Sequence, residues 1–257
     1  GYMTQEFVAR SAEQRPIALL CEGTNSGQAE THKLHSEREV KEAANNVVSK
    51  TSKLVATSFY GRDIDRINTL YSVAVANNRR FVVPIKTALL LTRLKEDIHL
   101  SVPDVLRDEN ILVYKKRKKT GAYEERDYYK WERSYLNKAI DHKYIHDNQS
   151  KVILAIEPKG FTELIDIRPD PGGQYIYSMS EPHSEIEAVD EEVQRSWLNH
   201  FTMGYHPIHA SGHALPKDIG EIIDSIRPKT LIPIHTEYPD TLTEFVKKER
   251  PKNLILK

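Results

Sequence analysis

Two histidines near the end of the chain each follow a short apolar stretch, and this placement suits chemistry on a phosphate. His213 lies in the stretch 205–214, and His235 lies in the stretch 232–237. Between them, isoleucines recur at helical spacing after Pro216, which predicts a helix. A strand, helix, strand sequence of this length makes the two strands parallel, so we expect both histidines at one edge of the same sheet. Ligands of α/β proteins bind at that edge.

Small residues beside His213 favour an anion as the ligand. Ser211 and Gly212 predict a turn whose backbone amides can approach a ligand closely. Pro216 begins a helix whose positive end faces the same place. His209 lies just upstream, where a role at this phosphate and a packed structural role are both compatible with the sequence. We therefore expect a phosphate site at Ser211, Gly212 and the helix start.

A carboxylate occupies a comparable position near the beginning of the chain. Glu22 follows the apolar run 17–21, which predicts a strand, and precedes Gly23-Thr24-Asn25. Taken alone, a glutamate at such a place is more often a surface group in a loop. Cys21 is the one cysteine of the sequence, which excludes an internal disulfide framework. Its position inside the apolar run indicates a buried structural thiol.

The middle of the chain predicts an α/β domain. Apolar strands alternate with helices between residues 36 and 94, a pattern typical of a parallel, doubly wound sheet. Ser36 and Glu39 form a capping box at the start of the first of these helices. Further along, residues 125–142 predict a long polar helix. The five consecutive cations at 115–119 are compatible with a grip on a nucleic-acid backbone or with a solvated hairpin tip.

Hydroxyl groups follow two strands of this domain. Ser58 ends a buried strand, where a phosphate oxygen can be held by a hydroxyl and by the amides of the next helix. A helix cap is the alternative role for that serine. Arg66 lies one turn into the same helix, and Ser178 and Ser180 end a later strand. We expect these strand ends to offer small donors to a common anion.

Composition restricts the class of protein without identifying it. The 257 residues carry 37 Lys and Arg against 37 Asp and Glu, so the formal net charge is zero. A nucleic-acid-binding chain of this composition needs a local basic patch. The sequence has no apolar run long enough to span a bilayer and no signal-peptide pattern, so we interpret the chain as cytoplasmic, with no membrane partner.

The motifs, taken in order, resemble those of a known family. The string His-Ala-Ser-Gly-His-Ala at 209–214, followed by a helix and Ile-Pro-Ile-His-Thr-Glu at 232–237, is similar to the last two motifs of the β-CASP branch of metallo-β-lactamase-fold nucleases, which includes ribonuclease J. The stretch 18–25 looks like the first special motif of that family. The resemblance implies a Rossmann-like, parallel-sheet β-CASP domain at 31–204, inserted into the C-terminal part of a metallo-β-lactamase αββα domain at 1–30 and 205–257.

The resemblance also implies roles for individual residues. Glu22 would hold the tautomer of His213, which would contact the scissile phosphate and act as general acid. His235 would ligate one of two zinc ions. Residues implied in phosphate or RNA binding are Ser211, Gly212, His209, Ser58, Arg66, Ser178 and Ser180. On this basis the preferred substrate is single-stranded RNA, and the preferred activity is that of a 5′-3′ exoribonuclease.

One departure from the family pattern is informative. Such nucleases bind zinc through an early His-x-His-x-Asp-His run and further ligands, of which only His235 has a counterpart here. We therefore expect the chain to be the C-terminal portion of a longer enzyme, inactive alone because a catalytic zinc needs about three protein ligands. Expected partners are RNA, the missing N-terminal half and a second copy in a homodimer. The alternatives are a noncatalytic nucleic-acid-binding β-CASP scaffold subunit and an unrelated nucleotide-binding α/β protein.

Overall fold

The computed structural model describes residues 2–26, 36–157, 159–182 and 184–242. Contacts divide the chain into a terminal unit, residues 1–33 with 211–257, and an inserted unit, residues 34–210. The expected boundaries lay at 30/31 and 204/205, so the segment 205–210 belongs to the inserted unit instead. No helix among the described residues is long and apolar enough to cross a membrane.

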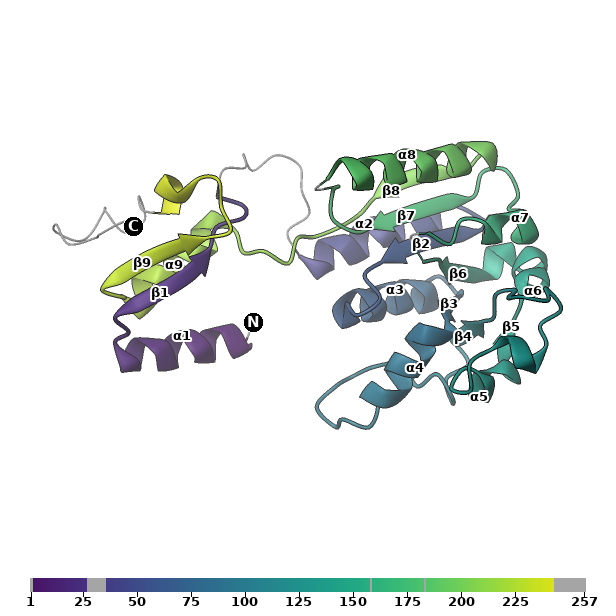
Figure 1. Cartoon of the computed structure of the whole chain (residues 1–257), viewed down its shortest axis with the longest axis horizontal. Coiled ribbons are helices and arrows are strands. Elements are labelled where there is room, and N and C mark those ends of the chain that lie inside the picture. The colour runs from purple at the N-terminus through teal and green to yellow at the C-terminus, as the bar shows by residue number, and fades with distance from the viewer. Residues whose placement is uncertain (1, 27–35, 158, 183, 243–257) are drawn as a thin grey trace. The chain divides into compact units, whose positions relative to one another are not determined.

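In the part of the chain that the structure describes, the terminal unit contains two helices and a pair of parallel strands. Its elements are α1 (Tyr2–Gln14), β1 (Ala18–Glu22), α9 (Pro216–Ile226) and β9 (Thr230–Ile234). The strands β1 and β9 lie side by side, with Glu22 opposite Ile234 (Figure 1). Isoleucines of α9 pack with Leu231 and Leu242 into a small core, which explains their helical spacing in the sequence.

Pairing of β9 with β1 corrects one expectation. The sequence predicted that the strands on either side of α9 would be neighbours in one sheet. Instead, β8 (Gly204–Pro207) pairs with β7 (Gln174–Ser178) in the inserted unit. The prediction was wrong because a strand, helix, strand pattern does not specify which strand of the whole chain is the partner, and here the partner of β9 comes from the first 22 residues.

The inserted unit is built on a seven-stranded sheet in which every paired neighbour is parallel, in the order β5-β4-β3-β6-β2-β7-β8. Its larger elements are α2 (Glu37–Ser49), β2 (Val55–Phe59), α3 (Ile64–Ala76), β3 (Arg80–Pro84), α4 (Ile85–Leu94), β4 (Ile111–Tyr114), β5 (Ala139–Ile140), α6 (His142–Asp147), β6 (Val152–Ala155), α7 (Glu163–Ile167) and α8 (Glu185–His200). The Rossmann-like parallel sheet expected from the sequence is confirmed (Figure 1).

Two apolar layers enclose this sheet. One layer contains α2, α3 and α4, and the other contains α6, α7 and α8. The strands β2 and β6 are buried along their whole length, as expected for parallel strands covered on both faces. The first helix begins as predicted, because the Ser36 side chain accepts a hydrogen bond from the backbone amide of Glu39.

The long helix predicted at 125–142 is absent from this described segment. It contains a 3₁₀ turn (Glu125–Asp127), the short helix α5 (Arg133–Leu136) and β5, which pairs with β4. Tyr128 and Tyr135 are buried here. Asp141 caps α6, because its side chain accepts hydrogen bonds from the backbone amides of Lys143 and Tyr144. Tertiary burial of the tyrosines and the sheet pairing of β5 override the helical preference of the polar residues between them.

Candidate functional site

The carboxylate of Glu22 is held by three groups at the end of β1. Its Oε2 accepts the backbone amide of Thr24 at 2.9 Å, and its Oε1 accepts the amide of Ala214 at 3.2 Å. Nδ1 of His213 lies 3.3 Å from Oε2. Burial acts to raise the pKa of Glu22, but the hydrogen bonds from Thr24 and Ala214 and the proximity of His213 lower it overall below its usual 4.5. The carboxylate is therefore ionised at neutral pH.

The loop that carries His213 is fixed by residues from both ends of the terminal unit. The amide of His213 donates to the Ser211 hydroxyl at 3.2 Å, so that hydroxyl shapes the turn. The side-chain amide of Asn25 donates to the carbonyl of His213 at 3.0 Å and lies 3.3 Å from that of Ala214. The His213 side chain is 42% exposed and remains accessible to a ligand.

His235 completes the cluster from the end of β9. Its φ of 50° lies in the left-handed region, which turns the chain directly after the strand. Its Nδ1 is 2.9 Å from the Thr24 hydroxyl, and its ring centroid is 5.6 Å from that of His213. Thr24 thus contacts both groups: its backbone amide bonds to the Glu22 carboxylate, and its hydroxyl bonds to the imidazole of His235. Sequence reasoning did not assign roles to Thr24 and Asn25, although their place after a strand end was a signal.

The helix that follows this loop begins without a side-chain cap. Pro216 stands in the first turn of α9, and Leu215 at the N-cap position offers no hydrogen-bonding side chain. The first amides of a helix have no partners within it and carry a partial positive charge. Gly212 has open space around its Cα, since an added Cβ would meet no atom within 4 Å. These features leave the segment 211–216 suited to an anion.

The donors present do not by themselves form a zinc site. Among the described ranges, no group of three or more His, Cys, Asp or Glu side chains is arranged to hold a metal ion. His235, the residue expected from the sequence to ligate zinc, contacts the Thr24 hydroxyl through its Nδ1. A zinc site needs about three or four protein ligands.

In the inserted unit, a second polar cluster surrounds Arg66. This side chain is 1% exposed, and its Nε and Nη2 donate to the Glu37 carboxylate at 2.9 and 2.6 Å. Its Nη1 donates to the carbonyl of Ser178 at 3.1 Å and lies 3.4 Å from Nδ1 of His209. Thr69 also donates to Glu37 at 2.8 Å. Arg66 therefore joins α2, α3, the end of β7 and the segment after β8.

His209 is positioned by this cluster. Burial and the positive charge of Arg66 lower the pKa of His209 below its usual 6.5, so the imidazole is neutral at neutral pH. A neutral imidazole beside a guanidinium offers a hydrogen bond without adding charge. Glu37 was not identified from the sequence; its place in the first turn of a capped helix gave only a structural signal.

The structure argues against Ser58 and Ser178 as direct phosphate ligands. Ser58 is fully buried and donates to the carbonyl of Ile156 at 2.7 Å. Ser178 is 1% exposed and donates to the carbonyl of Ile208 at 2.6 Å. Both hydroxyl protons therefore link neighbouring strands. Ser180 is half-buried, and its hydroxyl lies 2.6 Å from that of Tyr60, so it alone of these three stays near a surface.

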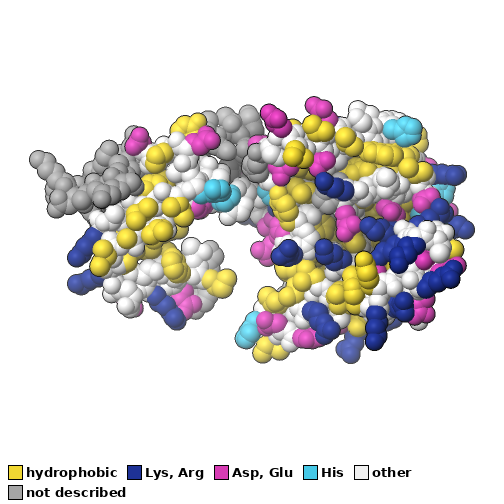
Figure 2. All heavy atoms as spheres, in the orientation of Figure 1, with side chains coloured by type: hydrophobic (Ala, Val, Ile, Leu, Met, Phe, Trp, Pro, Cys, Tyr) yellow, Lys and Arg dark blue, Asp and Glu magenta, His cyan; other side chains and the backbone are white. Residues whose placement is uncertain are grey.

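The five-cation run does not form an uncompensated basic patch. Lys116 pairs with Glu157, Arg117 with Asp166 and Lys118 with Glu132, while Lys115 lies over the ring of Tyr123. Lys and Arg side chains are interspersed with acidic ones over the visible face of this unit (Figure 2). Lys116, Arg117 and Lys119 are exposed, so the segment 115–119 is solvated, while three of its five cations are paired with carboxylates of the same unit.

Comparisons with known proteins agree with the motifs. A family model described as RMMBL, a Zn-dependent metallo-hydrolase RNA specificity domain, matches residues 201–256. Ribonuclease J 2 of Streptococcus pyogenes serotype M3 is 23% identical over 251 residues, covering 93% of this chain and 40% of that protein. A protein of unknown function from Enterococcus faecalis V583 has a similar structure, with a TM-score of 0.64 at 18% identity.

That structural match covers 98% of this chain and 52% of the other, and at this identity it shows the fold alone. The chain thus spans about half or less of the length of the relatives that it matches.

Proposed function

We propose that this chain, a member of the β-CASP, ribonuclease J-like branch of the metallo-β-lactamase family, supplies the phosphate-contacting part of an RNA-processing metallo-hydrolase. The observation that carries the proposal is the meeting of Glu22, His213 and His235, although 191 positions separate the first two (213 − 22). A sheet pairing between the two ends of the chain brings them together.

Glu22 and His213 fit a paired role in proton transfer. The carboxylate lies beside Nδ1 of His213, which favours a proton on that nitrogen and leaves Nε2 for the substrate. A protonated His213 would donate from Nε2 to the leaving oxygen of a phosphodiester, and the carboxylate would stabilise the imidazolium. Two backbone amides fix the carboxylate, so the imidazole is oriented before substrate binds.

Within the terminal unit we propose the segment 211–216 as a phosphate site, and within the inserted unit we propose His209 and Ser180 as donors to a nucleic-acid phosphate. The uncapped start of α9 and the open space at Gly212 support the first part of this assignment. Arg66 is a positioning residue for His209, because its guanidinium is buried and bonded to Glu37. For the substrate we propose single-stranded RNA with a 5′-monophosphate, digested from that end.

For the metal we propose that His235 contributes one ligand in a longer parent protein and that the remaining ligands come from sequence outside these residues. Zinc, when bound, would supply hydroxide near neutral pH and neutralise phosphate charge. The lack of a metal-ligand group among the described residues favours a second candidate, a noncatalytic RNA-binding subunit of the same family.

The test is a nuclease assay of the longer parent on 5′-monophosphate and 5′-hydroxyl RNA. We expect His213→Ala to lower kcat by about 10²- to 10⁴-fold, the usual contribution of a general acid, with RNA affinity changed only a few-fold. His200→Ala, an exposed histidine at the end of α8, is the matched control and leaves kcat unchanged.

Each alternative has its own outcome in the same assay. A parent that binds RNA but shows no metal-dependent cleavage identifies the noncatalytic subunit. Unchanged kcat in His213→Ala removes the proposed general acid.

A further inference from the structure

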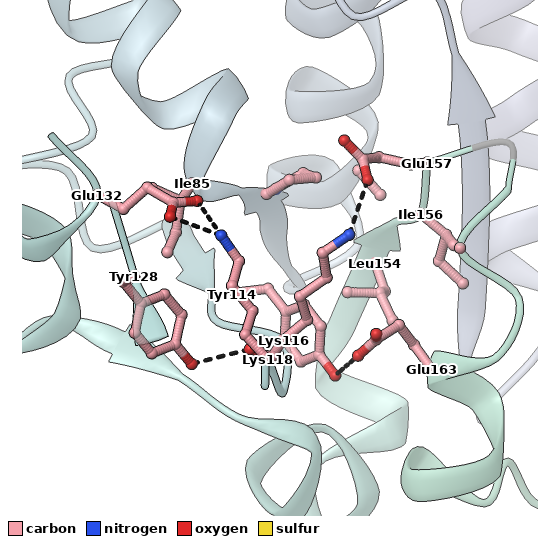
Figure 3. Close-up of a pocket in the computed structure, with 13 residues that line it drawn as sticks. Ile85, Tyr114, Lys116, Lys118, Tyr128, Glu132, Leu154, Ile156, Glu157 and Glu163 are labelled. Carbon is pink, nitrogen blue, oxygen red and sulfur yellow. Dashed lines mark hydrogen bonds and ion pairs between the residues drawn. The ribbon is translucent and has the colours of Figure 1, made fainter. Parts of the chain in front are cut away.

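The inserted unit has a pocket that the proposed function leaves unused. It lies at the carboxyl ends of β3, β4 and β6 and has a cavity volume of about 70 Å³. One water needs about 10–15 Å³ on a comparable measure, so the pocket has room for a group of several heavy atoms. Ile85, Leu154 and Ile156 provide apolar walls, and the rings of Tyr114 and Tyr128 line it as well (Figure 3).

The topology of the sheet favours a ligand site at this position. β3 and β6 are neighbours in the sheet, yet β3 leads into α4 on one face and β6 leads toward α7 on the other. Where connections from adjacent parallel strands leave toward opposite faces, a crevice opens beyond the carboxyl ends of the strands. Binding sites of α/β proteins occur preferentially at such switch points.

The charges that line the pocket are only partly compensated. Lys118 binds both oxygens of Glu132, at 2.7 and 2.6 Å, and Lys116 contacts Glu157 at 3.1 Å. The two lysine side chains extend to these carboxylates on opposite sides of the pocket (Figure 3). Glu163 is the third carboxylate, and it accepts a hydrogen bond from a neutral phenol, the hydroxyl of Tyr114, at 2.8 Å. Three carboxylates against two ammonium groups leave one negative charge in excess.

Glu163 is thus a carboxylate without a cation of its own. Burial raises its pKa, and the hydrogen bond from Tyr114 and the charge of Lys116 only partly oppose that effect. Tyr114 donates to Oε2 of Glu163, and no hydrogen bond to Oε1 is found within the part of the chain that the structure describes. Glu163 is half-buried, so a ligand in the pocket with N–H donors can replace the water at Oε1.

We propose that this pocket binds a guanine base, with the Glu163 carboxylate accepting from the ring N1–H and the exocyclic amino group. Guanine presents two adjacent N–H donors on one edge, which match the two oxygens of a carboxylate. Its flat ring faces suit the apolar walls and the tyrosine rings. Adenine and uracil lack two adjacent donors on an edge, so they pair less well with a carboxylate.

The same chemistry serves a guanine within RNA or a free guanine nucleoside, and the two sources are separated by experiment. Calorimetric titration of the 257-residue chain with guanosine, inosine, adenosine and uridine reports on the pocket alone. These nucleosides carry no phosphate, and no cleavage is measured, so the result is independent of the proposed nuclease function. The expected order is guanosine, then inosine, which retains N1–H only, with the other two at least about tenfold weaker than guanosine.

Variants in and just after α7 provide the matched comparison. Glu163→Gln is expected to weaken guanosine binding at least about tenfold, because the amide offers one acceptor in place of two. Asp170→Asn, a neutralised carboxylate just beyond this helix that pairs with Lys53 outside the pocket, leaves the affinity unchanged. If Glu163→Gln does not fold by circular dichroism, Tyr114→Phe removes the hydroxyl that orients the carboxylate and is expected to weaken guanosine several-fold.

Three results would overturn the proposal: no guanosine binding at millimolar concentration, equal binding of all four nucleosides, or unchanged guanosine affinity in Glu163→Gln. A last arm compares the oligonucleotides UUGUU and UUAUU. Tighter binding of the first, lost in Glu163→Gln, identifies RNA as the source. Equal binding of the two, with guanosine binding intact, assigns the pocket to a free guanine nucleoside or nucleotide.

Discussion

Gly23 illustrates how one residue without a side chain supports the cluster at the end of β1. Its amide donates to the carbonyl of Ile234 at 3.1 Å, which continues the pairing of the two strands beyond Glu22. A Cβ built at this position would lie 2.7 Å from Cδ1 of Leu242 and 2.8 Å from the hydroxyl of Ser26. A larger residue at this position would therefore force the side chains of Leu242 and Ser26 to shift.

We expect Gly23→Ala to destabilise the chain by about 1–3 kcal/mol, the usual cost of overpacking a close contact. Gly212→Ala is the matched control, because an added Cβ there meets nothing within 4 Å, and its effect should stay within about 0.5 kcal/mol. Urea unfolding followed by circular dichroism measures both. Equal stability of the two variants would contradict the close approach inferred at Gly23.

At the scale of elements, the Glu37–Arg66 pair connects α2 and α3 with the end of β7. Arg66 is almost fully buried, whereas the Glu37 side chain is 35% exposed. Burial acts to raise the pKa of Glu37, but hydrogen bonds from Arg66 and Thr69 and the charge of Arg66 lower it below 4.5 overall. Since the folded pKa is below the unfolded one, this group stabilises the fold above about pH 4.5, and its contribution is lost as the pH falls through the lowered folded pKa.

The corresponding prediction concerns Glu37→Gln. At pH 7 the variant should lose about 1–2 kcal/mol of unfolding free energy, less than the ~3–5 kcal/mol for a fully buried pair because Glu37 is partly exposed. Between pH 7 and pH 3 the difference from the unaltered chain should shrink, because protonated Glu37 no longer attracts Arg66. Chemical unfolding at several pH values measures this.

Glu42→Gln is the control for that experiment, since Glu42 lies on the same helix with a 70% exposed side chain and a 3.8 Å contact to Arg38. Its effect should remain below about 0.5 kcal/mol at every pH. A difference between Glu37→Gln and the unaltered chain that does not vary with pH would contradict the role of the ionised carboxylate.

Across the whole molecule, the sequence predicted structure best where the local pattern of apolar residues was enough to define the element, and less well where strand pairing depended on distant segments. The continuous apolar strands and capped helices of 36–94 predicted the parallel sheet, which is confirmed. The partner of β9 was predicted wrongly, because strand pairing depends on contacts between distant segments. Residues 125–142 were misassigned for a related reason: burial of two tyrosines and pairing of β5 outweigh local preference.

The candidate site residues also fall into two groups: those that the structure brings together and those whose side chains are used within the sheet. Glu22 ends β1 and His235 follows β9, so the β1–β9 register places them close together, whereas hydrogen bonds from Asn25 and to Glu22 hold the loop that carries His213 beside them. Ser58 and Ser178 follow the same rule of position, but their hydroxyls bond to neighbouring strands. Sequence position predicts the edge of a sheet at which a residue lies, whereas the packing of neighbouring strands decides whether its side chain reaches solvent.

The last prediction concerns these 257 residues as a unit. With His235 as the single ligand expected from the sequence, and no group of metal-binding side chains within 2–26, 36–157, 159–182 and 184–242, the chain should not form a catalytic zinc site. We expect the purified chain, supplied with Zn²⁺ or Mn²⁺, to cleave single-stranded RNA no faster than buffer alone. A longer parent that contains the His-x-His-x-Asp-His run should cleave the same RNA in the same assay, and removal of its metal by a chelator should abolish cleavage. Chelator-sensitive turnover by the 257-residue chain, lost in His235→Ala, would mean that these residues hold a catalytic metal without further ligands.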